Sequence, residues 1–96
     1  MFQKDPDSVM DFTLNWASWL GIDTISVSTW TLPAGITSED ETLTTTTTTI
    51  WLSGGSTTLG TIYEITNEIV TAAGRTEQRS IFIQMAENKH GVWSVT

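Results

Sequence analysis

The stretch GTIYEITNEIVTAAGRTEQRSIFIQM, residues 60–85, decides the fold of this 96-residue chain. In both halves, the residues at every second position form a mostly apolar set, which is typical of a β-strand. Successive side chains of a strand point to opposite faces of a sheet, so one such set faces the core. The face predicted to be buried carries Tyr63, Ile65, Asn67 and Ile69 in the first half and Ile81, Ile83 and Met85 in the second. These two runs predict a pair of antiparallel strands.

The segment between the two runs contains Gly74, which tolerates the positive φ of a tight turn and is typical of a β-hairpin. A three-residue loop at residues 73–75 predicts that Ile65 lies opposite Ile83 and that Tyr63 lies opposite Met85. This register places both apolar sets on one face, which a one-residue slip would prevent.

Residues 8–16 predict another strand, in which every second residue is apolar. The face expected toward the core carries Met10, Phe12, Leu14 and Trp16. The alternative is a helix, since Phe12, Trp16 and Leu20 are spaced by four, but the alternation favours a strand.

Residues 24–32, 36–43 and 45–52 predict the remaining strands. The last of these begins in a run of six threonines, residues 44–49, which we interpret as strand rather than as disordered low-complexity sequence because threonine is β-branched. No segment predicts a helix. The pattern indicates an all-β, immunoglobulin-like antiparallel β-sandwich of about seven strands over residues 8–86, with an N-terminal arm (1–7) and a C-terminal tail (87–96).

Composition excludes several classes of function. The net charge of −7 leaves too few cations for nucleic acid or for an anionic membrane surface. The chain has no cysteine, and thus no disulfide or thiolate site, and no apolar run long enough for a membrane helix. The first residues lack an apolar signal core, so we expect synthesis and use without export.

No motif for catalysis or cofactor binding is found. His90 lies in the tail without a nucleophile-elbow motif, and exposure to solvent explains it. The acidic groups at residues 5–11 and 39–41 match no calcium motif, and ordinary solvated carboxylates explain them. Nothing suggests the enclosed cleft of a glycoside hydrolase. We expect no enzyme activity, metal or cofactor.

The five tryptophans are the strongest signal for binding. Trp16 and Trp51 lie in apolar runs, which predicts that they pack in the core. For Trp19 and Trp93 we prefer a role in protein–protein contacts, with ordinary packing as the alternative. Sugar stacking, as in a carbohydrate-binding module, is a further alternative for the set. Arg75, in the hairpin turn, is the third interface candidate. A simpler explanation for Arg75 and Arg79 is that they form solvated ion pairs with Glu68 or Glu77.

Two groups of motifs, taken together, resemble a known family. The first group is Lys-Asp-Pro at residues 4–6, Asp-Phe at 11–12, Asn-Trp at 15–16, Trp-Leu at 19–20 and Asp-Thr-Ile at 23–25, running on to Ser28 and Trp30. The second is Ile-Thr-Asn-Glu-Ile at 65–69, Ala-Gly-Arg-Thr at 73–76 and Arg-Ser-Ile at 79–81. The pair resembles the fiber–tail adaptor family of tailed bacteriophages, over roughly residues 4–85.

The resemblance implies a non-enzymatic virion component of the tail, made in the host cytoplasm. It implies other tail and fiber proteins as partners, in a symmetric assembly of several copies, with no nucleic acid or membrane. The alternatives are a capsid decoration or head–tail connector protein and a carbohydrate-binding module. Because the threonine run carries no charge, Pro or bulge that would protect a sheet edge, we also expect it to pair with, or lie against, a neighbouring chain.

Overall fold

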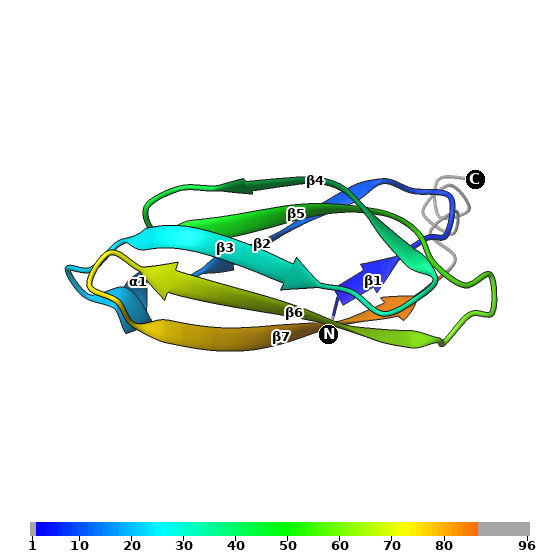
Figure 1. The fold of residues 1–96 in the computed structure, drawn as a ribbon. Coiled ribbons are helices and arrows are strands. Elements are labelled where there is room, and N and C mark those ends of the chain that lie inside the picture. The colour runs from blue at the N-terminus through cyan, green and yellow to red at the C-terminus, as the bar shows by residue number, and fades with distance from the viewer. Residues whose placement is uncertain (1, 87–96) are drawn as a thin grey trace, which may run out of the picture.

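The computed structural model describes residues 2–86, which form two packed β-sheets (Figure 1). The elements are β1 (Phe2–Lys4), β2 (Met10–Asn15), α1 (Ala17–Leu20), β3 (Ile25–Thr31), β4 (Ile36–Leu43), β5 (Thr47–Gly54), β6 (Ile62–Thr71) and β7 (Thr76–Met85). One sheet has the order β1-β7-β6-β3 and the other has the order β2-β5-β4. The predicted all-β, immunoglobulin-like sandwich of seven strands is confirmed.

The predicted hairpin is β6 and β7, but its register differs from the prediction. Tyr63 lies opposite Ile83, and Ile65 lies opposite Ile81. The backbone N–H of Thr71 donates to the Arg75 carbonyl at 2.8 Å, so the three-residue loop is residues 72–74 rather than 73–75. Moving the loop by one residue shifts the pairing by two, which keeps every side chain on its predicted face.

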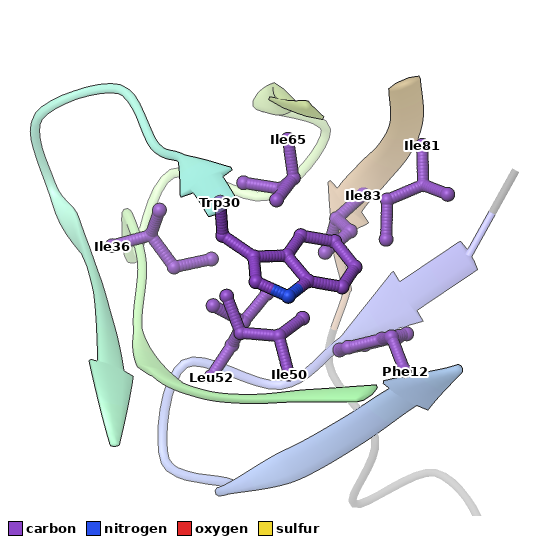
Figure 2. Close-up of a cluster of buried hydrophobic side chains, with 8 residues drawn as sticks. All are labelled: Phe12, Trp30, Ile36, Ile50, Leu52, Ile65, Ile81 and Ile83. Atoms are coloured by element: carbon purple, nitrogen blue, oxygen red, sulfur yellow. The ribbon is translucent and has the colours of Figure 1, made fainter. Parts of the chain in front are cut away.

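The larger core cluster lies between the two sheets and is almost wholly aliphatic and aromatic (Figure 2). It comprises Phe12, Trp30, Ile36, Ile50, Leu52, Ile65, Ile81 and Ile83. A second cluster of Trp16, Leu20, Ile25 and Ile69 fills the end of the sandwich near α1. The larger cluster is built from the alternating inner faces of the strands, whereas the smaller one adds Trp16 and Leu20, from the helical turn, to the strand residues Ile25 and Ile69.

The prediction that Trp51 packs in the core is wrong. Trp51 stands between Ile50 and Leu52, which are both fully buried, so strand alternation turns its side chain to the outer face, where it is 38% exposed. Trp30 occupies the core instead. A β-bulge between Ile25 and Val27 reverses the parity of β3, which turns Trp30 inward and leaves Val27 outside.

A polar network crosses the interior between the two core clusters. The Asn67 side chain is fully buried on the inner face of β6, and its Oδ1 accepts hydrogen bonds from the Thr48 hydroxyl at 2.6 Å and from Trp16 Nε1 at 3.2 Å. Its Nδ2 donates to Ser28 Oγ at 2.9 Å and to the Thr29 carbonyl at 3.2 Å. Because Thr48 and Asn67 belong to different sheets, this network ties the two sheets together.

The expected N-terminal arm contributes a strand to the sandwich. Residues 2–4 form β1, which pairs in parallel with β7, so the sheet is not purely antiparallel. Lys4 is fully buried, and its Nζ donates to the carbonyls of Gly54 at 2.7 Å and Asp5 at 3.0 Å. Burial lowers the pKa of Lys4, against the opposing effect of Asp5 and Asp7.

The threonine run does not form a free sheet edge. Thr47, Thr48 and Thr49 belong to β5, which lies between β2 and β4 and pairs with both, so no further strand can be added there. Residues 44–46 form the turn before β5 instead of its beginning, because the Thr44 hydroxyl accepts the backbone N–H groups of Thr46 and Thr47. The tail at residues 87–96, including Trp93 and His90, lies outside the described residues.

Candidate docking site

One end of the sandwich gathers four connections, and we call it the helix end (left in Figure 1). Backbone hydrogen bonds join its loops: Ile25 N–H donates to the Thr45 carbonyl at 2.9 Å, and Ala72 N–H donates to the Thr24 carbonyl at 2.9 Å. The α1 turn, residues 21–24, residues 44–46 and the hairpin loop therefore form one continuous surface.

A single helical turn departs from the prediction of strands alone. After β2, the Asn15 side chain accepts the backbone N–H of Ala17 at 2.9 Å, and the Leu20 N–H donates to the Trp16 carbonyl at 2.9 Å. Gly21, with φ of 64°, ends the turn. The spacing of Trp16 and Leu20, four residues apart, was the sequence signal for this turn, and both side chains are buried in the smaller core cluster.

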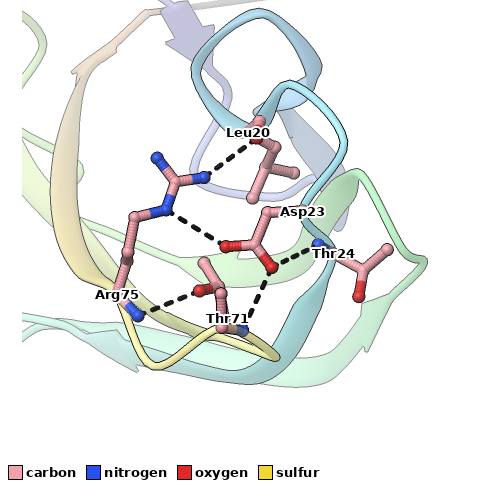
Figure 3. A network of polar contacts seen from close by, with 6 residues as sticks. Leu20, Asp23, Thr24, Thr71 and Arg75 are labelled. Atoms are coloured by element: carbon pink, nitrogen blue, oxygen red, sulfur yellow. Dashed lines mark hydrogen bonds and ion pairs between the residues drawn. The ribbon is translucent and has the colours of Figure 1, made fainter.

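Arg75 folds back from the hairpin onto this turn (Figure 3). Its Nε lies 3.1 Å from Asp23 Oδ2, and its Nη2 donates to the Leu20 carbonyl at 2.9 Å. The predicted pairing of Arg75 with Glu68 or Glu77 is wrong, since Asp23 is its ion-pair partner. The Arg75 side chain is nonetheless 43% exposed, so one face of it remains open to solvent.

Asp23 is the acceptor that closes the network in Figure 3. Its Oδ1 accepts the backbone N–H groups of Thr24 at 2.8 Å and Ala73 at 3.2 Å. The hydrogen bond from the Thr71 hydroxyl, followed by those from the Thr24 backbone, Arg75 and the Ala73 backbone, lowers the pKa of Asp23 to about 2, although desolvation opposes this. The carboxylate thus stays charged well below neutral pH.

Two neighbouring tryptophan rings lie beside this network, each covered by one arginine. The Arg75 guanidinium carbon lies 4.3 Å from the centre of the Trp19 ring, and that of Arg79 lies 4.3 Å from the centre of the Trp16 ring. The two tryptophan rings meet edge to face at 5.8 Å. Arg79 also donates to the Asn15 carbonyl at 3.3 Å. These contacts fix the side chains, as a preorganised contact surface requires.

Ile22 is a feature of this end that the sequence interpretation did not identify. It is fully exposed, at 105% of the reference area, in the turn directly before Asp23. Ala72 and Ala73 in the neighbouring loop are also exposed. An apolar residue between Gly21 and Asp23 in a turn was the only signal in the sequence.

The structure therefore brings together two of the three interface candidates. Trp19 and Arg75 contact each other at the helix end, and Trp93 lies outside the described residues. A shallow groove of about 540 Å³ lies elsewhere, against β3 and the start of β6, and is lined by Thr31, Leu32, Pro33, Ile62, Tyr63, Glu64 and Thr66.

Within residues 2–86, no cluster of three or more histidine, cysteine, aspartate or glutamate side chains has the arrangement of a metal site. None of the helices in this range is long and apolar enough to cross a membrane.

The fold defines a small β-sandwich protein, and the helix end is its candidate contact surface. The family model described as "Podophage GP4 fiber-tail adaptor protein gp77" matches residues 4–84. Because this match covers more than half of the chain, the protein belongs to the podophage fiber-tail adaptor family. No curated protein matches the chain. The resemblance drawn from the sequence motifs is confirmed.

Proposed function

We propose that this protein is a non-enzymatic component of the podophage tail that joins fibers to the tail. The observation that carries the proposal is the family match over residues 4–84. The partners are tail and fiber proteins, and the protein is made in the host cytoplasm and acts in several copies around a symmetric tail.

The helix end supports this function as one of the two contact surfaces that an adaptor needs. It combines a fully exposed isoleucine, a half-open arginine and a partly buried tryptophan. Tryptophan and arginine are enriched among the residues that dominate protein–protein binding, and Ile22 supplies apolar area that only a partner can bury.

The experiment locates the protein in the virion and tests the helix end with Ile22→Ser. Leu59→Ser is the matched control, because Leu59 is also exposed, at 54%, and lies in the loop between β5 and β6. Burying an isoleucine in an interface contributes about 1.5–3 kcal/mol, so we expect Ile22→Ser to lower incorporation into particles about tenfold or more. The control should incorporate as the wild type does.

Electron microscopy of the particles provides the second measurement. Density for the protein between the tail and its fibers supports the proposal. Density on the capsid surface or at the head–tail junction would overturn it in favour of a decoration or connector role. Equal incorporation of Ile22→Ser and wild type would remove the helix end as a contact surface.

A further inference from the structure

The outer face of the three-stranded sheet carries a row of three exposed side chains that no core contact explains. Asp11 lies directly opposite Trp51 on the neighbouring strand β2, and Asp40, which follows a β-bulge after Ser38, is the residue of β4 that pairs with Trp51. Residues directly opposite each other project on the same face, with Cβ atoms about 4.5–5.5 Å apart. The indole therefore stands between two carboxylates, and we call these three residues the Trp51 row.

Among the four tryptophans in residues 2–86, Trp51 is the most exposed, at 38%. Trp16 and Trp30 are buried, and Trp19 is covered in part by Arg75. Figure 1 shows β5 running between β2 and β4, so Trp51 stands on the middle strand of its sheet rather than at an edge.

The charge around the Trp51 row has one sign. The strands β2, β4 and β5 carry the carboxylates Asp11, Glu39, Asp40 and Glu41 and no lysine or arginine. Glu41 pairs with the buried Ile50 and so projects on the opposite face of β4, which leaves Asp11, Glu39 and Asp40 on the side of Trp51. Glu39 and Glu41 accept hydrogen bonds from serine hydroxyls, which leave their charge in place.

The three cations within residues 2–86 are engaged elsewhere. Lys4 is buried against the Gly54 carbonyl, Arg75 pairs with Asp23, and Arg79 covers Trp16. The negative charge of the Trp51 row is therefore not neutralised by any described residue of the chain.

We propose that the outer face of the β2-β5-β4 sheet docks a basic surface of a partner protein, with an arginine of that partner stacked on Trp51 between Asp11 and Asp40. A guanidinium stacks on an indole face and pairs with carboxylates in the same plane, which a lysine ammonium does less well. This inference rests on the proposed adaptor function and names the chemistry of one partner.

The neighbouring residues suit a protein partner. Next to the Trp51 row, Thr13, Thr49 and Thr42 form a second row across the same three strands, and the hydroxyls of Thr13 and Thr49 lie 2.9 Å apart. They place uncharged polar groups beside an aromatic centre, a combination found in protein–protein interfaces. A sugar would also stack on Trp51 and donate hydroxyl hydrogen bonds to the carboxylates, but a neutral sugar would leave their charge uncompensated, so the charge favours the arginine.

The test measures binding of the purified full chain to two preparations: phage particles assembled without it, and the purified fiber protein of the same phage. The test variant is Asp11→Asn with Asp40→Asn. The matched control is Glu64→Gln with Glu77→Gln, which removes the same charge from two exposed residues of the other sheet. We expect the test variant to bind one preparation at least about tenfold more weakly at low salt, and the control to bind within about twofold of wild type.

A second variant, Trp51→Thr, puts a β-branched residue that favours strands at this position and should weaken binding to the same preparation. If the wild type binds one preparation and the Asp11/Asp40 variant binds it equally well, this inference is wrong and the adaptor function stands. If the wild type binds neither preparation, both fall. If a host polysaccharide changes the fluorescence of the wild type, and Trp51→Thr alone abolishes that change, the face is a sugar site and the inference is overturned.

Discussion

Asn67→Ala tests whether the buried polar network holds the two sheets together. The substitution removes the acceptor of the fully buried Thr48 hydroxyl, whose bond to Asn67 is 2.6 Å long. Trp16 Nε1 keeps Thr48 Oγ1 as an acceptor at 3.2 Å, so one buried donor loses its partner rather than two. An unsatisfied buried donor costs about 1–3 kcal/mol, and the space left by the amide adds about 0.5–1 kcal/mol.

We therefore expect Asn67→Ala to lower the free energy of unfolding by about 3 kcal/mol, out of about 5–14 kcal/mol for a domain of this size. The midpoint of thermal unfolding should fall by about 12 °C or more. Thr48→Val removes one partner and leaves Asn67 Oδ1 bonded to Trp16, so its expected cost is about 1 kcal/mol. Thr49→Val is the control, since its hydroxyl bonds to Thr13 on the exposed face and should change stability by less than about 0.5 kcal/mol.

Equilibrium unfolding in urea, followed by tryptophan fluorescence, measures all three variants against the wild type. The dependence of the free energy on urea should stay the same, because the surface exposed on unfolding is unchanged. A loss below about 1 kcal/mol for Asn67→Ala would refute the argument. So would an equal cost for Thr48→Val and Thr49→Val, since burial would then have no bearing on the value of the hydroxyl.

Two further predictions concern single side chains. Trp30 Nε1 is buried and has no hydrogen-bond partner among the described residues, whereas Trp16 Nε1 has two acceptors. In urea unfolding, Trp30→Phe should therefore destabilise the protein less than Trp16→Phe does, by about 1–3 kcal/mol. The reverse order would contradict this. The pKa of Asp23 is about 2 in the folded protein and about 3.9 in an unfolded chain, so its contribution to stability is complete above pH 4 and is lost as the pH falls toward 2. Asp23→Asn should therefore lower the urea midpoint at pH 6 and reduce the fall in midpoint between pH 4 and pH 2; parallel pH profiles for the variant and the wild type would count against it.

The Arg75 contacts also change what a mutation at this position would measure. From the sequence, Arg75→Glu would be expected to leave folding intact and to weaken docking. In the structure the new carboxylate would face Asp23, at the place where Arg75 Nε now lies 3.1 Å from it. Loss of the ion pair and repulsion between two acids would destabilise the helix end, so Ile22 is the better probe of docking there.

Strand alternation predicted most of the fold because a sheet with one buried face obeys a period of two. The predictions from alternation that were wrong have physical causes that cannot be seen in a single sequence. The bulge at Ile25 and Val27 adds one residue to β3 and reverses the face of Trp30. The hairpin register depended on which three residues form the loop, and Gly74 can take a positive φ at either position. The parallel strand β1 has only three residues, too few for a periodic signal.

The candidate docking site was harder to predict from the sequence than the fold was. Trp19 and Arg75 were selected for their residue types, and what joins them is a contact across more than fifty positions of the chain. Asp23 and Ile22 were not selected, because a carboxylate or an isoleucine in a turn has no motif of its own. Trp51 was assigned to the core because it stands in the apolar run of residues 50–52, although the same alternation, applied strictly, turns it outward.

The two proposed surfaces differ in the charge that they carry. Both described arginines lie near the helix end, and the four carboxylates of β2 and β4 lie on the three-stranded sheet. An adaptor must bind two different partners without binding itself or exchanging them. At the helix end, Asp23 neutralises Arg75, so apolar area and aromatic rings would dominate the proposed contact there. The sheet face keeps its charge, so the contact proposed for it should depend on salt. The two contacts should therefore separate experimentally, with the sheet face releasing its partner as ionic strength rises while the helix end keeps its own.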